Sequence, residues 1–415
     1  MKKTIATILI TCFCLLNAQI VMGQPLENNR PVVNAEAAIL MDATTGEVLF
    51  EQNASQKLAM ASTTKIMTAI LALEKGNLDA QVTVSPTVLD RRSVYGTRIY
   101  LEPGEQLTLR NLLYALLLNS ANDAAVAIAE HIAGNVDNFV KMMNDKAKEI
   151  GATNTNFMNP HGLTENGHYS CARDLALFAR YGLQNPVFAQ IVKTKQAEIP
   201  RVKAGLPTQL DNINHMLWLY DGIDGVKTGY TAEAGNCVVE SATRNGRQLI
   251  VVILKSTAAK AMYKDAENLF DYGFAGFENK LVASKGQIMD SVSLANGKVL
   301  KLTLPSDVFA TVSRGETSNF TFETKATNLN LPIVQGEPRG ELQIYKQGKP
   351  FQTVPLVAAE KVELPLTLQV RTNLYLEWAV LAIITLILTA MYIPSITRRR
   401  KRSAARARDY GYYQD

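Results

Sequence analysis

Cysteine and histidine are both scarce in this chain of 415 residues, which contains four of each. Cys12 and Cys14 fall in the first apolar segment, so only Cys171 and Cys237 remain for the folded part. No cysteines or histidines have the spacing of a metal site. We therefore expect no metal and no organic cofactor. Cys171 and Cys237 could form a disulfide in an exported protein, and two buried thiols are the equal alternative.

Two common hydrolase signatures are also missing. The sequence has no His-Glu-x-x-His helix and no Gly-x-Ser-x-Gly elbow. The histidines therefore lack the motifs that would make them metal ligands or the base of a catalytic triad: His131, His161, His168 and His215. We interpret His161, in the turn formed by residues 159–163, as a structural residue or part of a cleft wall.

The chain has little surplus charge once its C-terminal end is set aside. Its formal net charge is +5 at pH 7, but residues 396–415 hold seven Arg or Lys and only two Asp. The rest of the chain is neutral, which excludes the basic patch of a nucleic-acid-binding protein. Hydrophobic residues make up 47% of the chain and charged residues 20%, a composition typical of a foldable protein with room for two domains.

Long apolar runs occur only near the two ends. Residues 1–23 have the charged start and short apolar run of a signal peptide, with an uncleaved anchor as the alternative. Residues 378–393 carry no charge and approach the length of a membrane span, with a buried helix as the alternative. The arginine-rich cluster that follows favours a cytoplasmic end. We therefore expect an exported protein with a transmembrane anchor over residues 374–396, a cytoplasmic tail over 397–415 and the remainder on the outer face of the cell membrane.

The region between these ends changes its pattern near residue 278. Before that point, apolar and β-branched runs predict five antiparallel strands, over residues 37–42, 47–51, 226–231, 236–243 and 247–255. Apolar residues at helical spacing predict five helices between the second and third strands: one from residue 62 through residue 73, and others over residues 108–118, 123–133, 139–150 and 171–181. A further helix is expected over residues 258–274.

From residue 281 to about residue 367 the sequence alternates in short stretches broken by Asn-Gly, Pro and Gly. This pattern predicts a separate small β domain. The expected fold class is thus α+β: a catalytic domain over residues 31–277, with about five antiparallel strands and a block of helices, followed by an all-β domain over residues 281–367 and a C-terminal transmembrane helix.

A Ser-x-x-Lys motif, Ser62 to Lys65, lies inside an apolar stretch with helical spacing. If Ser62 begins the helix, Lys65 lies one turn further along the same face, with its amine next to the hydroxyl. Burial and a second cation nearby would both favour the neutral amine, which could then take the proton of Ser62. Alone, the motif would indicate only a polar helix start.

Two more motifs follow in the chain. Ser120-Ala121-Asn122 lies between two predicted apolar helices, and Lys227-Thr228-Gly229 lies on a predicted strand. Alone, the Ser-Ala-Asn motif would indicate a helix cap, and the Lys-Thr-Gly motif would indicate a strand end. The three together, in this order, resemble the penicillin-recognising serine acyl-transferases, and their flanks look most like the low-molecular-mass D-alanyl-D-alanine carboxypeptidases among the penicillin-binding proteins. The resemblance implies a β-lactamase/transpeptidase-like fold over about residues 31–277.

The resemblance also implies the chemistry. Ser62 would attack the carbonyl of the penultimate D-alanine of a peptidoglycan pentapeptide, with Lys65 as base, and Ser120 would relay a proton to the departing D-alanine. β-Lactam antibiotics would acylate Ser62 as covalent inhibitors. The backbone N–H groups of Ser62 and Tyr230 would form the oxyanion hole, although Tyr230 replaces a residue that is often His in the family. The remaining motif residues would bind the substrate: Asn122, Lys227, Thr228 and Gly229.

Two other functions fit part of this pattern. A serine β-lactamase would share the three motifs, but a class A enzyme needs a positioned glutamate, and Glu165 lies in a turn that looks like that of the carboxypeptidases. A non-catalytic cell-wall-binding protein could retain the motifs as relics. The complete set of motif side chains and the appended β domain favour the carboxypeptidase.

Overall fold

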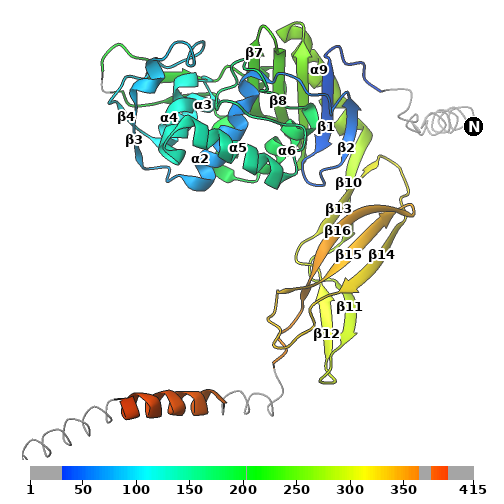
Figure 1. Ribbon diagram of the computed structural model, residues 1–415. Helices are drawn as coiled ribbons and strands as arrows, with labels where there is room; N and C mark the ends of the chain where they lie inside the picture. Colours follow the sequence, from blue (N-terminus) through cyan, green and yellow to red (C-terminus); the bar gives the residue numbers. More distant parts are fainter. Residues whose placement is uncertain (1–29, 202, 364–374, 391–415) are drawn as a thin grey trace, which may run out of the picture. The chain divides into compact units, whose positions relative to one another are not determined.

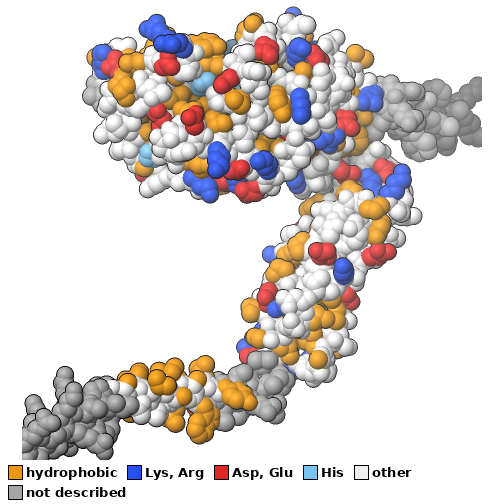
Figure 2. Space-filling model, viewed as in Figure 1, with side chains coloured by type: hydrophobic (Ala, Val, Ile, Leu, Met, Phe, Trp, Pro, Cys, Tyr) orange, Lys and Arg blue, Asp and Glu red, His pale blue; other side chains and the backbone are white. Residues whose placement is uncertain are grey.

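The computed structural model describes residues 30–201, 203–363 and 375–390 (Figure 1). The expected signal peptide and cytoplasmic tail lie outside the described residues, as do residue 374 and residues 391–396 of the expected anchor. Residues 375–390 form a helix whose side chains are largely apolar and exposed (Figure 2). Within the three described ranges, no helix has both the length and the apolar character that a membrane crossing requires.

The chain forms two compact units. The first contains the residues up to Leu281 together with Phe309–Thr317, and the second contains Val282–Val308 and the residues from Ser318 onward. The segment Phe309–Thr317 thus returns to the first unit, where Thr311 donates its backbone N–H to the Glu47 carboxylate at 2.7 Å.

A five-stranded antiparallel sheet is the centre of the first unit, as predicted. Its strand order is β2-β1-β9-β8-β7, so the two N-terminal strands pair with the late hairpin. The strands are β1 (Ala37–Asp42), β2 (Val48–Gln52), β7 (Ile223–Thr231), β8 (Gly235–Arg244) and β9 (Arg247–Ser256). All five are adjacent to helices on at least one face, which explains their apolar character.

Helices cover both faces of this sheet (Figure 1). One face, with Val239 and Val252, packs against a block formed by α2 (Lys65–Lys75), α3 (Leu109–Leu117), α4 (Asn122–Ala133), α5 (Val136–Ile150), α6 (Ala172–Leu183) and α7 (Pro186–Lys193). The other face, with Val238 and Val251, packs against α9 (Ala259–Gly276). The alternation of side chains along each strand therefore supplies two separate hydrophobic cores.

Shorter elements connect these layers. They are η3 (Pro86–Leu89), α8 (Met216–Leu219) and the strand pairs β3 (Gln81–Thr83) with β4 (Gln106–Thr108) and β5 (Gln196–Glu198) with β6 (Gln209–Asp211). The side chain of Thr108 caps α3 by accepting the N–H of Asn111, as expected for a residue type that favours helix starts.

The second unit is built around its own antiparallel sheet of order β11-β12-β16-β15-β14. Its strands are β11 (Ile288–Ser293), β12 (Val299–Thr303), β14 (Phe320–Ala326), β15 (Pro338–Lys346) and β16 (Lys349–Ala358). Leu300, Leu342 and Leu356 are fully buried in its core. Two further strands, β10 (Phe277–Ala283) and β13 (Val308–Ser313), form a separate two-stranded sheet, and most of their residues belong to the first unit.

Cys171 and Cys237 are both buried and unbonded. Of the two alternatives that the sequence left open, the structure therefore has two buried thiols. Burial raises the pKa of each thiol to about 12, so both stay protonated and unreactive at neutral pH.

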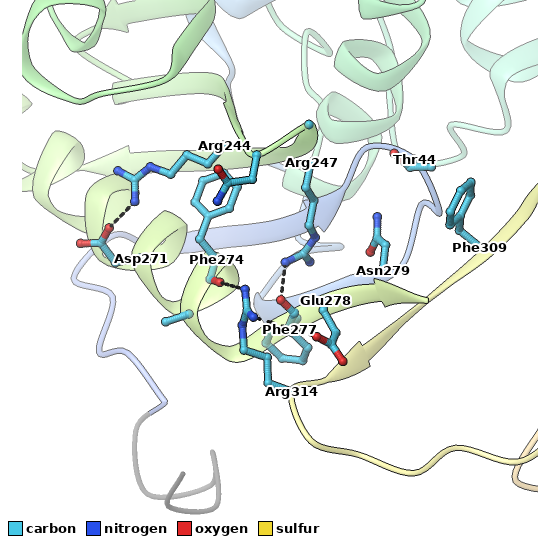
Figure 3. Close-up of a pocket in the computed structure, with 13 residues that line it drawn as sticks. Thr44, Arg244, Arg247, Asp271, Phe274, Phe277, Glu278, Asn279, Phe309 and Arg314 are labelled. Carbon is cyan, nitrogen blue, oxygen red and sulfur yellow. Dashed lines mark hydrogen bonds and ion pairs between the residues drawn. The ribbon is translucent and has the colours of Figure 1, made fainter. Parts of the chain in front are cut away.

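A cavity of about 830 Å³ lies at the C-terminal end of α9 and is lined by three arginines (Figure 3). Arg247 donates to the carbonyls of Gly273 and Phe277 and pairs with buried Asp42, and Arg314 donates to the carbonyl of Phe274. These bonds add donors to backbone carbonyls at the C-terminal end of the helix, where the last carbonyls lack a following turn. None of the motif residues lines this cavity, and we assign its arginines to the stability of the α9 terminus.

Candidate active site

Ser62 lies on a tight turn that leads into the first helix of the block. The turn is the 3-10 segment η2 (Ala61–Thr64), and α2 begins directly after it at Lys65. We expected a helix from Ser62, and the α-helix begins three residues later. Side chains at positions i and i+3 eclipse each other in a 3-10 turn, so Lys65 still reaches Ser62, with Nζ 2.8 Å from Oγ.

The amine of Lys65 is surrounded by three oxygen atoms. Besides Ser62 Oγ, Nζ lies 2.7 Å from Asn122 Oδ1 and 2.6 Å from the carbonyl oxygen of His161. The amide and carbonyl oxygens can only accept hydrogen bonds, whereas a hydroxyl can also donate. An ammonium could donate to all three oxygens, whereas a neutral amine would donate to Asn122 and His161 and accept the hydroxyl hydrogen of Ser62.

Two features favour that neutral amine. Lys65 is completely buried, and the charge of Lys227 acts on it from the neighbouring strand. Burial is the larger effect, and both lower the pKa of Lys65 well below its usual value, against a smaller opposing effect of Asp123. The arrangement can therefore supply a base for Ser62 at neutral pH.

The second motif brings Asn122 and Ser120 to the start of α4. Asn122 Nδ2 donates to the carbonyl of Tyr95, and its backbone N–H donates to the carbonyl of Thr97 at 2.8 Å. Ser120 is buried and has φ of 65°, in the left-handed region that residues other than glycine seldom adopt. Such strain persists only where the surrounding structure imposes it, and it is frequent at functional sites.

The third motif lies on β7, which packs directly against the Ser62 turn. A Cβ atom at Gly229 would lie 2.7 Å from the backbone nitrogen of Ser62 and 3.0 Å from Cβ of Ala61. The space at Gly229, which we had assigned to the substrate, is thus occupied by the turn itself. Glycine is required there because the strand and the turn approach so closely.

Lys227, on the same strand, is buried and donates to the carbonyl of Thr228 at 2.9 Å. Burial lowers the pKa of Lys227 to about 7, and the buried carboxylate of Glu240 on β8 partly offsets that decrease. Tyr230 is 68% exposed at the end of the motif, so its side chain is free of the packed interior.

The turn of residues 159–163 supports the Ser62 segment from the other side. The side-chain oxygen of Asn159 accepts the backbone N–H groups of His161 and Gly162. Gly162 has φ of +92°, and a Cβ atom there would lie 1.9 Å from the carbonyl oxygen of Ala61. The glycine therefore lets its turn lie directly against the carbonyl of Ala61, which itself has φ of 48° immediately before the nucleophile.

His168 is a site residue that the sequence patterns did not reveal. Its Nε2 lies 2.9 Å from Oγ1 of Thr64, and its Nδ1 accepts the backbone N–H of Met158. Burial first, and then the charge of Lys65, lowers the pKa of His168 to about 4 and that of His161 to about 3. A pKa this low makes both neutral rings very weak bases, which does not suit a catalytic base. The other two histidines, His131 and His215, make no contact with the motif residues among the bonds described.

Comparisons with known proteins agree with this geometry. The model of the D-alanyl-D-alanine carboxypeptidase family matches residues 24–258, and that of the C-terminal domain of penicillin-binding protein 5 matches residues 277–364. D-Alanyl-D-alanine carboxypeptidase DacF of Bacillus subtilis is 34% identical over 372 residues, which are 88% of this chain and 95% of the relative.

Two solved structures extend the comparison to the fold. Penicillin-binding protein 5 from Haemophilus influenzae superposes with a TM-score of 0.69 at 29% identity, covering 81% of this chain and 99% of that one. The Streptomyces K15 DD-transpeptidase has a TM-score of 0.55 at 35% identity, covering 59% of this chain and 99% of that one. The chain described here belongs to the D-alanyl-D-alanine carboxypeptidase family of serine hydrolases.

Proposed function

We propose that this chain removes the terminal D-alanine from peptidoglycan stem pentapeptides through an acyl-enzyme on Ser62. The observation that carries the proposal is the 2.8 Å contact between the Ser62 hydroxyl and a buried lysine amine whose other two neighbours can only accept hydrogen bonds. A serine hydroxyl becomes a competent nucleophile when such a base takes its proton.

In the acylation step, Ser62 Oγ attacks the carbonyl carbon of the penultimate D-alanine while Lys65 Nζ takes the hydroxyl proton. The developing oxyanion is bound by the backbone N–H groups of Ser62 and Tyr230. Collapse breaks the peptide C–N bond and leaves an ester on Ser62. Ser120 passes the proton from Lys65 to the nitrogen of the departing D-alanine.

In the second step, water attacks the ester, and Lys65 takes a proton from it before returning one to Ser62. The shortened peptide then leaves with a new carboxylate. β-Lactams would enter by the same acylation step, because their strained amide presents a carbonyl to the same nucleophile.

Substrate binding is assigned to the residues around this centre. The Lys227 ammonium and the Thr228 hydroxyl would bind the terminal carboxylate of the peptide. Asn122 uses one amide N–H on Tyr95, and its second N–H is available for a carbonyl of the substrate backbone. Gly229 would contribute indirectly, by letting the strand lie against the Ser62 turn.

The proposal is tested by D-alanine release from a pentapeptide ending in D-Ala-D-Ala. The wild-type chain is expected to release D-alanine, and Ser62→Ala is expected to release none above background. Ser55→Ala, a change at an exposed serine seven residues earlier, serves as the matched control and should behave as the wild type. Equal release by the wild type and Ser62→Ala would defeat the assignment.

We also propose that the chain is exported by a signal peptide over residues 1–23 and held at the cell membrane by residues 374–396, with residues 397–415 in the cytoplasm. The proposal is supported by the uncharged run of residues 378–393 and the basic cluster after it. The full chain should sediment with membranes, and a chain ending at residue 363 should be released. Recovery of both in the same fraction would contradict the anchor.

A further inference from the structure

Glu240 is a fully buried carboxylic acid in the middle of β8. The residues two positions away on either side, Val238 and Ala242, belong to the hydrophobic core between the sheet and α9, so Glu240 faces α9 and not the active site. Its Oε2 accepts the side-chain N–H of Asn214 at 2.9 Å, and its Oε1 is buried with no hydrogen-bond partner among the described residues. A carboxyl group in such surroundings is costly unless a charge nearby compensates it.

That charge lies on the other side of the sheet. In the ladder between β7 and β8, Glu240 is paired with Val226, the residue immediately before Lys227. Lys227 is paired with Val239, which faces the helical block, so the ammonium and the carboxylate approach from opposite faces. Each acts on the other: burial raises the pKa of Glu240 and Lys227 lowers it, whereas burial lowers the pKa of Lys227 and Glu240 raises it.

The other groups facing Glu240 cannot replace Lys227. Asn214 is neutral, and Tyr263 on α9 is an acid whose pKa is raised by burial and then by Glu240, so it stays protonated. Lys65 is the second buried amine in the region, and its pKa is lowered by burial and by Lys227. If Glu240 is ionised and Lys227 protonated, each charge compensates the other, and a neutral Lys65 then avoids a second buried cation beside Lys227.

We propose that Glu240 is a positioning residue that acts through Lys227: its negative charge, on the face of the sheet opposite the active site, keeps Lys227 in the ammonium form that binds the substrate carboxylate. The inference rests on the proposed function. It explains why a glutamate is buried among apolar side chains on this face of β8, and it assigns to the strand a part in catalysis without contact with the substrate. Through Lys227, the same charge also favours the neutral amine of Lys65.

The test is the pH dependence of kcat/KM for D-alanine release by Glu240→Gln, which keeps the shape of the side chain and its acceptor for Asn214. Lys227 acts as an ammonium, so its contribution is complete below its pKa and is lost as the pH rises through it. Without Glu240 the alkaline limb is expected to move down by about one pH unit, which gives about a tenfold loss at pH 8.5, mainly in KM, and at most about a twofold loss at pH 6. Glu233→Gln, at an exposed acid between β7 and β8, is the matched control and should keep the wild-type profile.

Further measurements keep the test decisive. Glu240→Met, which also removes the charge, should give the same shift if Glu240→Gln fails to fold. A folded variant of either kind with an unchanged alkaline limb would overturn the proposal. If the wild type releases no D-alanine, the proposed function fails separately, and NMR titration of the Lys227 side chain, assigned with Lys227→Arg, still tests the inference. The Lys227 pKa should fall in Glu240→Gln, and an unchanged value would overturn the proposal.

Discussion

Replacing Lys65 with methionine is expected to slow acylation of Ser62 by about a hundredfold to ten-thousandfold, the range typical of losing a general base. Methionine fills nearly the same buried volume but cannot accept the hydroxyl proton. The substitution also removes the hydrogen bonds from Lys65 to Asn122 and to the carbonyl of His161, so this carbonyl loses its donor. The measurement is the rate of covalent labelling by a chromogenic or fluorescent penicillin in excess over the protein.

Lys75→Met is the control for this change, because Lys75 is an exposed lysine at the end of the same helix. It should label at the wild-type rate. The wild-type labelling rate should also persist to pH values well below the ordinary pKa of lysine, since the pKa of Lys65 is lowered and the amine is active when neutral. A Lys65→Met variant that labels within threefold of the wild type would show that another group removes the proton.

Gly162→Ala is expected to reduce kcat/KM for D-alanine release by about a hundredfold, because displacing a catalytic group by about 1 Å costs this much. The new Cβ atom would lie 1.9 Å from the carbonyl oxygen of Ala61 and 2.9 Å from Oγ1 of Thr64, so the Ser62 turn must move. The turn of Gly162 also presents the His161 carbonyl that accepts from Lys65. The single methyl group would therefore shift both members of the catalytic pair.

Gly167→Ala separates this effect from backbone strain. Gly167 lies in the same loop with φ of +85°, but the atom nearest to a new Cβ would be 3.7 Å away. That variant should lose about 1 kcal/mol of stability from its left-handed conformation and keep its activity. Thermal unfolding and D-alanine release should be measured for both variants. Similar kcat/KM values for the two would contradict the role of Gly162 in positioning the turn.

Much of the fold could be predicted from local patterns. The five strands and the longer helices have regular apolar spacing over many residues, and their order in the chain indicated an inserted helical block. The helix α7 was missed although Asn185 and Pro186 form a typical helix start. Its eight residues are too few to distinguish a helix from a buried strand by spacing alone.

The limits of the first unit depend on contacts that are distant in sequence. The segment Phe309–Thr317 belongs to this unit, although it lies within the stretch that alternates like the β domain. Thr311 contacts Glu47 and Thr45, which are more than 260 residues away along the chain. No local pattern indicates such a return.

The motifs predicted which side chains would gather, but not what holds them. Ser62, Lys65 and Asn122 meet as expected, and β7 brings Gly229 against the same turn. The supporting residues belong to no motif. Glu240 is buried on the opposite face of the sheet, and His168 lies 104 residues along the chain from Thr64, whose hydroxyl it contacts. Only tertiary packing gives these two residues their positions. This is why Glu240 and His168 were not predicted.

The most direct test of the account is to find where penicillin becomes attached. After brief exposure to a labelled penicillin, digestion and mass spectrometry of the wild-type chain should show one long-lived penicilloyl group, on the peptide that contains Ser62. An adduct on another residue would contradict the assignment of the nucleophile. Rapid hydrolysis of penicillin with no trapped adduct would indicate a β-lactamase instead.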